Sequence, residues 1–228
     1  MAKVLFMNIL YHYWFSPGSR LARIALAEKG EEIELVLELP WNRRHEFMAL
    51  NPACTVPVLQ IKDGPALCGS YAITEYLEEK AQTQNLMGDS PEQRAETRRL
   101  LDWFDVKFNE EVSQLIITEK VMKRFLKRGT PEAAAIRCAS HNIKGHLKYI
   151  EYLTDRRNWL AGDDFSYADI CAAAHLSCID YLGDIPWADF ERAKAWYARV
   201  KSRPSFRPIL SDMIAGLPPA PHYKNLDF

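Results

Sequence analysis

The sequence predicts two domains, an α/β domain followed by an all-helical domain. Strand and helix patterns alternate over about the first 80 residues, whereas no alternating strand pattern occurs between residues 92 and 212. A polar segment at residues 82–91 separates the two regions and is typical of a linker. The chain has 228 residues, which is enough for both domains to bury a core. We expect domains at residues 1–82 and 92–216, followed by a proline-rich tail at residues 217–228.

The first domain has the expected element order β-α-β-α-β-β-α. Ser16 and Pro17 suit a helix start, because a serine hydroxyl caps free N–H groups and proline at the first helical position loses no donor. Gly30 suits the end of that helix. The element order is that of a thioredoxin-like domain. Strands are expected at residues 4–10, 33–39, 56–61 and 66–68, and the other helices end at residues 50 and 81.

Residues 51–70 contain the predicted hairpin. Asp63 and Gly64 separate two apolar runs, and this pair signals a hairpin because Gly64 can take positive φ without a steric penalty. Pro57 cannot donate to a strand ladder, so we expect it at the start or the edge of its strand. Only an X-Pro bond takes the cis form at modest cost, so the turn at Val56 and Pro57 could present the Val56 backbone outward.

The second domain is predicted to consist of long helices. Thr130 and Pro131 are expected to start one of them, as cap and first residue. Ser166 and Asp169 form a capping-box pattern at the start of another. Three prolines prevent residues 217–228 from forming a helix. The expected helices lie at about residues 92–127, 131–156, 167–182, 187–202 and 205–215.

Bulk composition excludes several function classes. A net charge of −1 gives no global attraction to nucleic acid or anionic membranes. No apolar run approaches the roughly 20 residues of a membrane-spanning helix. Five cysteines, without a Cys-x-x-Cys pair, argue against a disulfide framework or zinc site and for a reducing cytosol. We expect a soluble cytoplasmic protein with no metal and with neither nucleic acid nor membrane as a partner.

Four motifs resemble those of the glutathione transferase (GST) family, and together they cover nearly the whole chain. They stand in the family's order and at similar gaps. The resemblance implies a GST fold, with a thioredoxin-like N-terminal domain, a C-terminal helical bundle and assembly as a homodimer. The motifs are residues 16–30 (SPGSRLARIALAEKG), 51–59 (NPACTVPVL), 70–77 (SYAITEYL) and 166–169 (SYAD).

The resemblance also implies a glutathione site at Ser16, Val56, Pro57 and Ser70. Ser16 would stabilise the glutathione thiolate by a hydrogen bond, and Ser19 and Tyr11 are alternatives for this role. The Val56 backbone would pair with the cysteinyl part of glutathione. Ser70, at a helix N-terminus, suits the γ-glutamyl carboxylate. Each residue also has a purely structural interpretation: Ser16 and Ser70 as helix caps, and Pro57 as a turn that the fold requires.

Position 69 departs from the family pattern. Family members carry an acidic or amide residue before the serine, whereas this chain has Gly69, so a partner for the γ-glutamyl ammonium group is missing. Losing one charge-assisted hydrogen bond costs about 1.5–3 kcal/mol, which is roughly 10- to 100-fold in affinity. We therefore expect no required cofactor and no required catalysis. The alternative is an active transferase that uses Ser16 to conjugate glutathione to an electrophile.

A basic region begins in the last turns of the first long helix of the second domain and extends into the next helix. Eight Lys or Arg residues and one acidic residue lie between positions 120 and 148, while the whole chain is near neutral. Such a region is either a solvated helix face or a docking surface for an acidic protein. DNA binding is disfavoured because aromatic residues are not interleaved with the charges. If the region docks a protein, the expected contact residues are Ile136, Arg137, Ser140 and Lys144.

Two further features lie outside the glutathione site. Trp41 stands in a loop beside Arg43 and Arg44, and Trp and Arg are frequent interface anchors, although a loop Trp can also pack on a neighbour. The chain ends in Asn-Leu-Asp227-Phe228. With the basic region, these features resemble a branch of GST-like cell-division proteins of alphaproteobacteria that bind the tubulin-like polymer FtsZ.

Resemblance to this branch implies a homodimer at the division site, with FtsZ as its partner. Its two binding faces would bridge and bend filaments without catalysis. The contact residues would then be those of the basic region together with Trp41, Asp227 and Phe228. A GST-like binder of RNA polymerase is a third class that the sequence leaves open.

Overall fold

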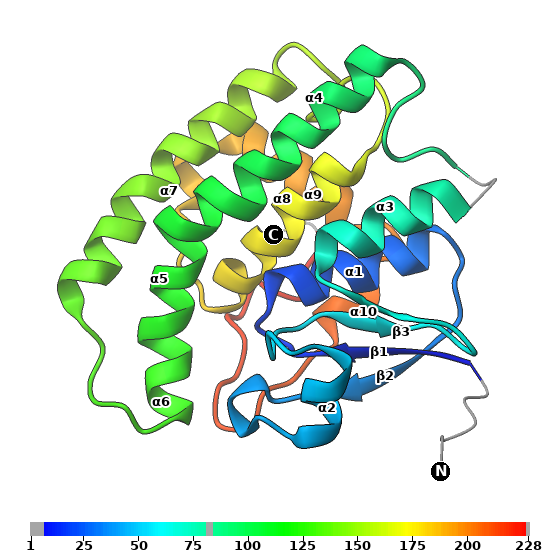
Figure 1. Cartoon of the computed structure of the whole chain (residues 1–228). Coiled ribbons are helices and arrows are strands. Elements are labelled where there is room, and N and C mark those ends of the chain that lie inside the picture. Colours follow the sequence, from blue (N-terminus) through cyan, green and yellow to red (C-terminus); the bar gives the residue numbers. More distant parts are fainter. Residues whose placement is uncertain (1–6, 81–83, 227–228) are drawn as a thin grey trace. The chain divides into compact units, whose positions relative to one another are not determined.

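The computed structural model describes residues 7–80 and 84–226 (Figure 1). Residues 1–6, 81–83, 227 and 228 lie outside the described ranges. The chain divides into two compact units, Met1–Gln84 and Asn85–Phe228. The first unit is built on a sheet and the second on helices, so the predicted combination of an α/β and an all-helical part is confirmed.

The first unit contains a four-stranded mixed sheet with the strand order β2-β1-β3-β4. β1 (Asn8–His12) lies parallel to β2 (Ile33–Leu37) and antiparallel to β3 (Val58–Gln60), and β3 lies antiparallel to β4 (Ala66–Cys68). Leu10 faces Leu35 on one side and Leu59 on the other. Leu10 and Leu59 are buried, because β1 and β3 are the inner strands.

Among residues 7–80, three α-helices and a short 3-10 turn complete this unit. α1 (Pro17–Glu28) supplies the crossover that the parallel β1–β2 pair requires. α3 (Ser70–Lys80) packs beside α1 (Figure 1). Both helices bury apolar side chains at helical spacing, with Leu21 and Ile24 on α1 and Ile73 and Leu77 on α3. Between β2 and β3 lie η1 (Pro40–Asn42) and α2 (His45–Leu50).

The hairpin forms as predicted, but its turn differs in detail. Asp63, and not Gly64, has positive φ, at 54°. Gly64 is needed for another reason: a Cβ at this position would lie 2.9 Å from Ile61 Cγ2. The Val56–Pro57 peptide bond is cis, and β3 begins directly after Pro57, as expected for a residue that cannot donate to the ladder.

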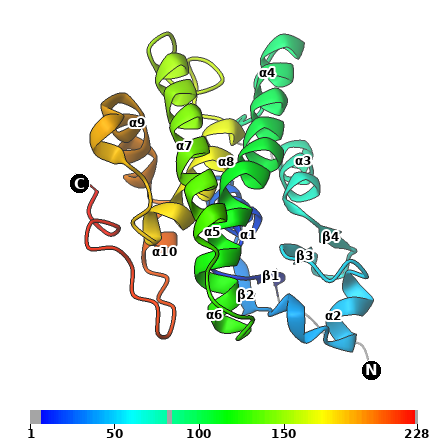
Figure 2. The ribbon, with the colours of Figure 1, turned by 90° about the vertical axis from the view of Figure 1, so that its left-hand side faces the viewer.

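The second unit consists of helices up to Leu210, and the described residues after it form turns and one isolated bridge. α4 to α6 follow one another without a break from Pro91 to Phe125, and Figure 2 shows them as one column beside α7. All of α8 is buried, so it is the central helix of the unit. The elements are α4 (Pro91–Asp102), the π-helical η2 (Trp103–Ser113), α5 (Gln114–Ile117), the π-helical η3 (Thr118–Met122), α6 (Lys123–Phe125), α7 (Ala133–Thr154), α8 (Tyr167–Tyr181), the 3-10 turn η4 (Trp187–Asp189), α9 (Glu191–Lys201) and α10 (Arg207–Leu210).

Three helix boundaries differ from the sequence expectation. Thr130 is not a cap: Glu132 is the N-cap residue of α7, and its N–H donates to Glu119 Oε2 at 2.7 Å, so a side chain distant in sequence replaces the cap. The helix expected at residues 187–202 opens as the 3-10 turn η4 before α9 begins. The last expected helix is only α10, because the chain turns at Gly216, with φ 75°, and Ile214 pairs with Leu217.

Across residues 7–80 and 84–226, no helix is both long enough and apolar enough to cross a membrane.

Candidate functional site

Ser16 is the N-cap residue of α1, as the sequence predicts. Its Oγ accepts a hydrogen bond from the Ser19 N–H at 3.1 Å, and its backbone is extended. A serine hydroxyl that accepts as a cap keeps its own proton for a second hydrogen bond. Ser16 is half-buried. Its hydroxyl therefore caps the helix and is still partly accessible to a ligand.

The first turn of α1 meets Pro57 and Ser70. A Cβ built on Gly18 would lie 3.3 Å from Pro57 Cδ and 3.4 Å from Ser70 Oγ. A Cβ at this position would be crowded, so glycine suits the close approach. The structure thus brings the first turn of α1, which Ser16 caps, close to Pro57 and Ser70. We call Ser16, Val56, Pro57 and Ser70 the Ser16 corner.

The Val56 main chain forms an open edge of this corner. Within the described ranges, neither its N–H nor its C=O takes part in a hydrogen bond. The neighbouring groups are engaged: Pro57 C=O accepts from Gly69 N–H at 2.9 Å, and Thr55 C=O accepts from Asn51 Nδ2 at 2.9 Å. An unpaired donor and acceptor on one extended residue can bind another chain in the manner of a strand.

Gly69 explains why the corner lacks an acidic group. Its φ is +91°, a value that side-chain-bearing residues rarely adopt, and no atom lies within 4 Å of a Cβ built there. Space is therefore open at the Cβ position of residue 69, but a glycine there supplies no carboxylate.

The two alternative hydroxyls are less suited to a ligand than Ser16. Ser19 is fully buried, and its Oγ accepts from the Tyr13 N–H at 3.3 Å. The Tyr11 ring packs against Phe47 with centroids 5.6 Å apart. Of the three residues, Ser16 is the one that forms part of the corner.

Trp41 packs on a neighbouring ring and also keeps part of its indole accessible, so it fits both the packing role and the interface role considered for it. It lies in η1, and its ring meets the Tyr13 ring edge-on, with centroids 5.0 Å apart. The loop is held by the buried Glu38, whose carboxylate pairs with Arg44 and raises the pKa of that guanidinium. Trp41 itself stays half-buried, so part of its indole is still accessible for contact.

Most of the predicted basic region lacks acidic partners. Lys120 pairs with Asp184 at 2.5 Å, and Lys123 pairs with Glu119 at 2.6 Å. The other six cations have no carboxylate within 4.0 Å among the described residues. They are Arg124, Lys127, Arg128, Arg137, Lys144 and Lys148, and all six are exposed.

Three of these cations form a row along α7. Arg137, Lys144 and Lys148 are seven and four residues apart, a spacing that places them on one helix face. Ile136 and Ser140 are half-buried next to them, and Ser140 Oγ donates to the Ile136 C=O at 2.9 Å. We call Arg137, Lys144 and Lys148 the basic row. Asp227 and Phe228, the other predicted contact residues, lie outside the described ranges.

A groove of about 510 Å³ between η2 and α7 contains side chains that the sequence analysis missed. His146 lies at its base, where Nδ1 accepts from Trp103 Nε1 at 3.2 Å and Nε2 contacts Glu111 Oε2 at 2.9 Å. Burial lowers the pKa of His146, although Glu111 opposes this shift. Trp103, Lys107 and Glu111 recur every four residues, and this stripe was the available sequence signal.

Replacing His146 is expected to flatten the pH dependence of stability. Because burial lowers the pKa of His146, the unfolded chain binds this proton more readily, and the free energy of unfolding falls as pH drops through about 6.5. Urea unfolding at about pH 7.5 and about pH 5.5 should show a smaller difference for His146→Gln than for the wild type. His45→Gln, at an exposed position on α2, is the control. An unchanged difference in His146→Gln would contradict this assignment.

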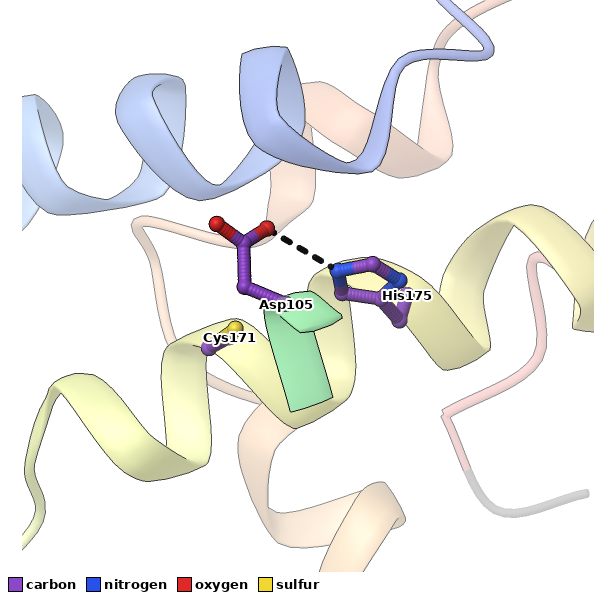
Figure 3. A group of neighbouring side chains, drawn as sticks. All are labelled: Asp105, Cys171 and His175. Carbon is purple, nitrogen blue, oxygen red and sulfur yellow. Dashed lines mark hydrogen bonds and ion pairs between the residues drawn. The ribbon is translucent and has the colours of Figure 1, made fainter. Parts of the chain in front are cut away.

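Asp105 of η2 lies beside Cys171 and His175 of α8 (Figure 3). Their ligand-type atoms lie within 4.8 Å of one another. Both ring nitrogens of His175 are already bonded, Nδ1 to Ser113 Oγ at 2.9 Å and Nε2 to Asp105 at 3.4 Å. Burial and the nearby carboxylate hold the pKa of the Cys171 thiol well above its usual range, which favours the neutral thiol. We interpret the cluster as a hydrogen-bonded pair beside a buried thiol.

Comparisons with known proteins agree with both units. Residues 15–80 match the glutathione S-transferase N-terminal domain, and residues 114–204 match the C-terminal domain. FtsZ-localized protein A of Caulobacter vibrioides is 47% identical over 96% of this chain and 97% of its own length.

Two solved structures are similar to this chain over nearly its whole length. The crystal structure of a glutathione S-transferase from Rhodospirillum rubrum F11 has a TM-score of 0.96 and 50% identity, covering 97% of this chain and 100% of that one. The structure of FzlA from C. crescentus has a TM-score of 0.94 and 46% identity, with the same coverage. The family predicted from the motifs is therefore confirmed: the chain belongs to the glutathione S-transferase family.

Proposed function

We propose that this chain is a GST-like cell-division protein that binds FtsZ filaments. It acts as a cytoplasmic homodimer at the division site, bridging and curving filaments without a required catalytic step. The observation that carries this proposal is the 47% identity, over 96% of the chain, to a protein named for its localisation with FtsZ. Nucleic acid and membranes are not among the proposed partners.

The proposed contact residues combine charge with a few apolar anchors. Arg137 and Lys144 of the basic row are exposed and lack carboxylate partners within the described ranges, so they can steer an acidic filament surface into contact. Ile136 and Ser140 lie beside them, and Trp41 offers a half-buried indole. We extend the surface to Asp227 and Phe228 from the sequence resemblance alone.

A homodimer would make this surface bivalent. Two linked sites on one particle convert the second filament contact into an intramolecular event, which raises the apparent affinity without any new contact. A bivalent particle can also join two filaments, which a monomer with one such face cannot do.

Co-sedimentation with FtsZ polymerised in GTP tests the proposal directly. We expect the protein to pellet with polymer and to stay in the supernatant when FtsZ is kept unpolymerised. A pull-down from the native cytosol with mass spectrometry is the complementary measurement. Recovery of RNA polymerase subunits in place of FtsZ would favour the third class, and absence of FtsZ from both experiments would overturn the proposal.

An active glutathione transferase is the second candidate, and the Ser16 corner favours it. The Ser16 hydroxyl, the unpaired Val56 main chain and Ser70 at the start of α3 support this candidate, because they match three of the contacts expected for glutathione. Retention on glutathione resin, with thioether formation that Ser16→Ala abolishes, would support this function.

Gly69→Glu is expected to bind glutathione about 10- to 100-fold more tightly than Gly69→Ala, because it restores a carboxylate for the γ-glutamyl ammonium group. Both variants carry the same strain at φ +91°, and no neighbouring atom obstructs either Cβ. Their comparison by isothermal titration calorimetry therefore isolates the carboxylate. Equal affinities would mean that the missing acid does not limit glutathione binding.

A further inference from the structure

The described part of the C-terminal tail is docked onto the second unit, although it contains no helix. Tyr223 is fully buried. Main-chain and side-chain bonds hold the segment before it: Ala220 N–H donates to Tyr181 C=O at 2.8 Å, and Tyr181 Oη donates to Leu217 C=O at 2.7 Å. The tail is therefore an ordered part of this unit up to the end of the described range.

Lys201, the last residue of α9, is buried and contacts the tail through a hydrogen bond. Its side chain is fully buried, and Nζ donates to the Asn225 C=O at 2.7 Å. The ammonium also lies over the Tyr197 and Tyr223 rings, 5.5 Å and 5.9 Å from their centroids. Burial lowers the pKa of Lys201, and the carboxylate of Asp180, 3.8 Å away, opposes that shift.

Asp180 supplies a second point of attachment. This α8 residue is fully buried, and its Oδ1 accepts from Trp187 Nε1 at 2.8 Å. The same oxygen lies 2.9 Å from Nε2 of His222, a tail residue. Asp180 and Lys201 therefore reach the tail at His222 and at Asn225, three residues apart.

Core packing alone does not explain a charged pair at this place. Replacing a buried ion pair by apolar side chains of similar volume is often neutral or stabilising, because both charges must be desolvated. A charged donor aimed at one carbonyl group provides direction, which an apolar contact does not. The Asn225 C=O is the last point in the described range that these contacts hold.

We propose that Asp180 and Lys201 form a buried clamp that positions the C-terminal tail for contact with the filament partner. The clamp acts through the tail, so both are positioning residues. The part of the proposal that concerns binding rests on the proposed function, whereas the part that concerns tail docking does not.

Hydrogen–deuterium exchange of the full-length Lys201→Met variant tests the clamp. Methionine keeps an unbranched apolar chain but removes the charge and the donor. We expect protection at residues 220–226 to fall about tenfold while protection in α8 is retained. Lys194→Met, seven residues earlier on α9, is the matched control and should leave tail exchange unchanged. Unchanged tail protection in Lys201→Met would overturn the clamp.

His222→Ala provides a second test at a position that is 35% exposed, where loss of the whole fold is not expected. It removes the tail's contact with Asp180 and should raise exchange at residues 220–226 without changing the Tm. If Lys201→Met fails to fold, His222→Ala alone tests the clamp. Unchanged tail exchange in His222→Ala would then contradict the clamp.

Pelleting with polymerised FtsZ distinguishes a failure of the proposed FtsZ-binding function from a failure of the clamp. We expect clamp variants with a released tail to bind about tenfold more weakly than the wild type. If wild-type protein does not pellet, the proposed function fails and the exchange results still decide the clamp. If the wild type pellets and a variant with a released tail pellets equally well, the clamp has no role in binding and that part of the inference is wrong.

Discussion

Lys144→Glu is expected to abolish co-sedimentation with polymerised FtsZ while leaving thermal unfolding unchanged. Lys144 is exposed, lacks a carboxylate partner within the described ranges and lies in the basic row with Arg137 and Lys148. Truncating one member of a buried charge pair at an interface costs about 2–5 kcal/mol, which corresponds to roughly 30-fold or more in affinity. Reversing the charge adds repulsion to this loss.

Lys62→Glu is the matched control, because Lys62 is an exposed lysine in the turn between β3 and β4. This variant should pellet like the wild type. Asp227→Lys is expected to lose binding as Lys144→Glu does, from the predicted role of the chain's last residues. Normal pelleting of both Lys144→Glu and Asp227→Lys would remove α7 and the tail from the proposed surface.

Asp169→Ala is expected to lower the free energy of unfolding by more than about 4 kcal/mol. The carboxylate is fully buried and accepts four hydrogen bonds. Oδ1 accepts from Leu160 N–H at 3.0 Å and Trp196 Nε1 at 2.8 Å, and Oδ2 accepts from the N–H and the hydroxyl of Ser166, both at 3.1 Å. An unsatisfied buried donor costs about 1–3 kcal/mol, and alanine would leave several.

Urea unfolding followed by near-UV circular dichroism measures this effect. Domains are typically stable by only about 5–15 kcal/mol, so Asp169→Ala is expected to unfold at a much lower urea concentration. Ser166→Ala is the control, since it removes one cap and should cost about 1 kcal/mol. A difference between Asp169→Ala and wild type of less than about 1 kcal/mol would show that water replaces the lost bonds.

Local rules account for the parts of the fold that could be predicted. Ser16 caps α1 through a neighbouring N–H, Gly30 follows that helix with φ 70°, and Ser166 and Asp169 form a capping box. Each interaction joins residues no more than four positions apart, so a sequence pattern contains it. The prediction for Thr130 was wrong because the replacement contact, from Glu119 to the Glu132 N–H, spans thirteen positions.

The sequence by itself determined the two-part architecture and the family, since periodicity and contiguous motifs encode them. Only the tertiary structure decided which basic side chains lack an intramolecular ion pair and are available to bind a partner. Lys120 is neutralised by Asp184, 64 positions away, whereas the basic row has no described partner. It also decided that Lys201, which closes an otherwise ordinary helix, is buried beneath the tail. Burial and ion pairing depend on contacts between distant segments, and periodicity does not record those contacts.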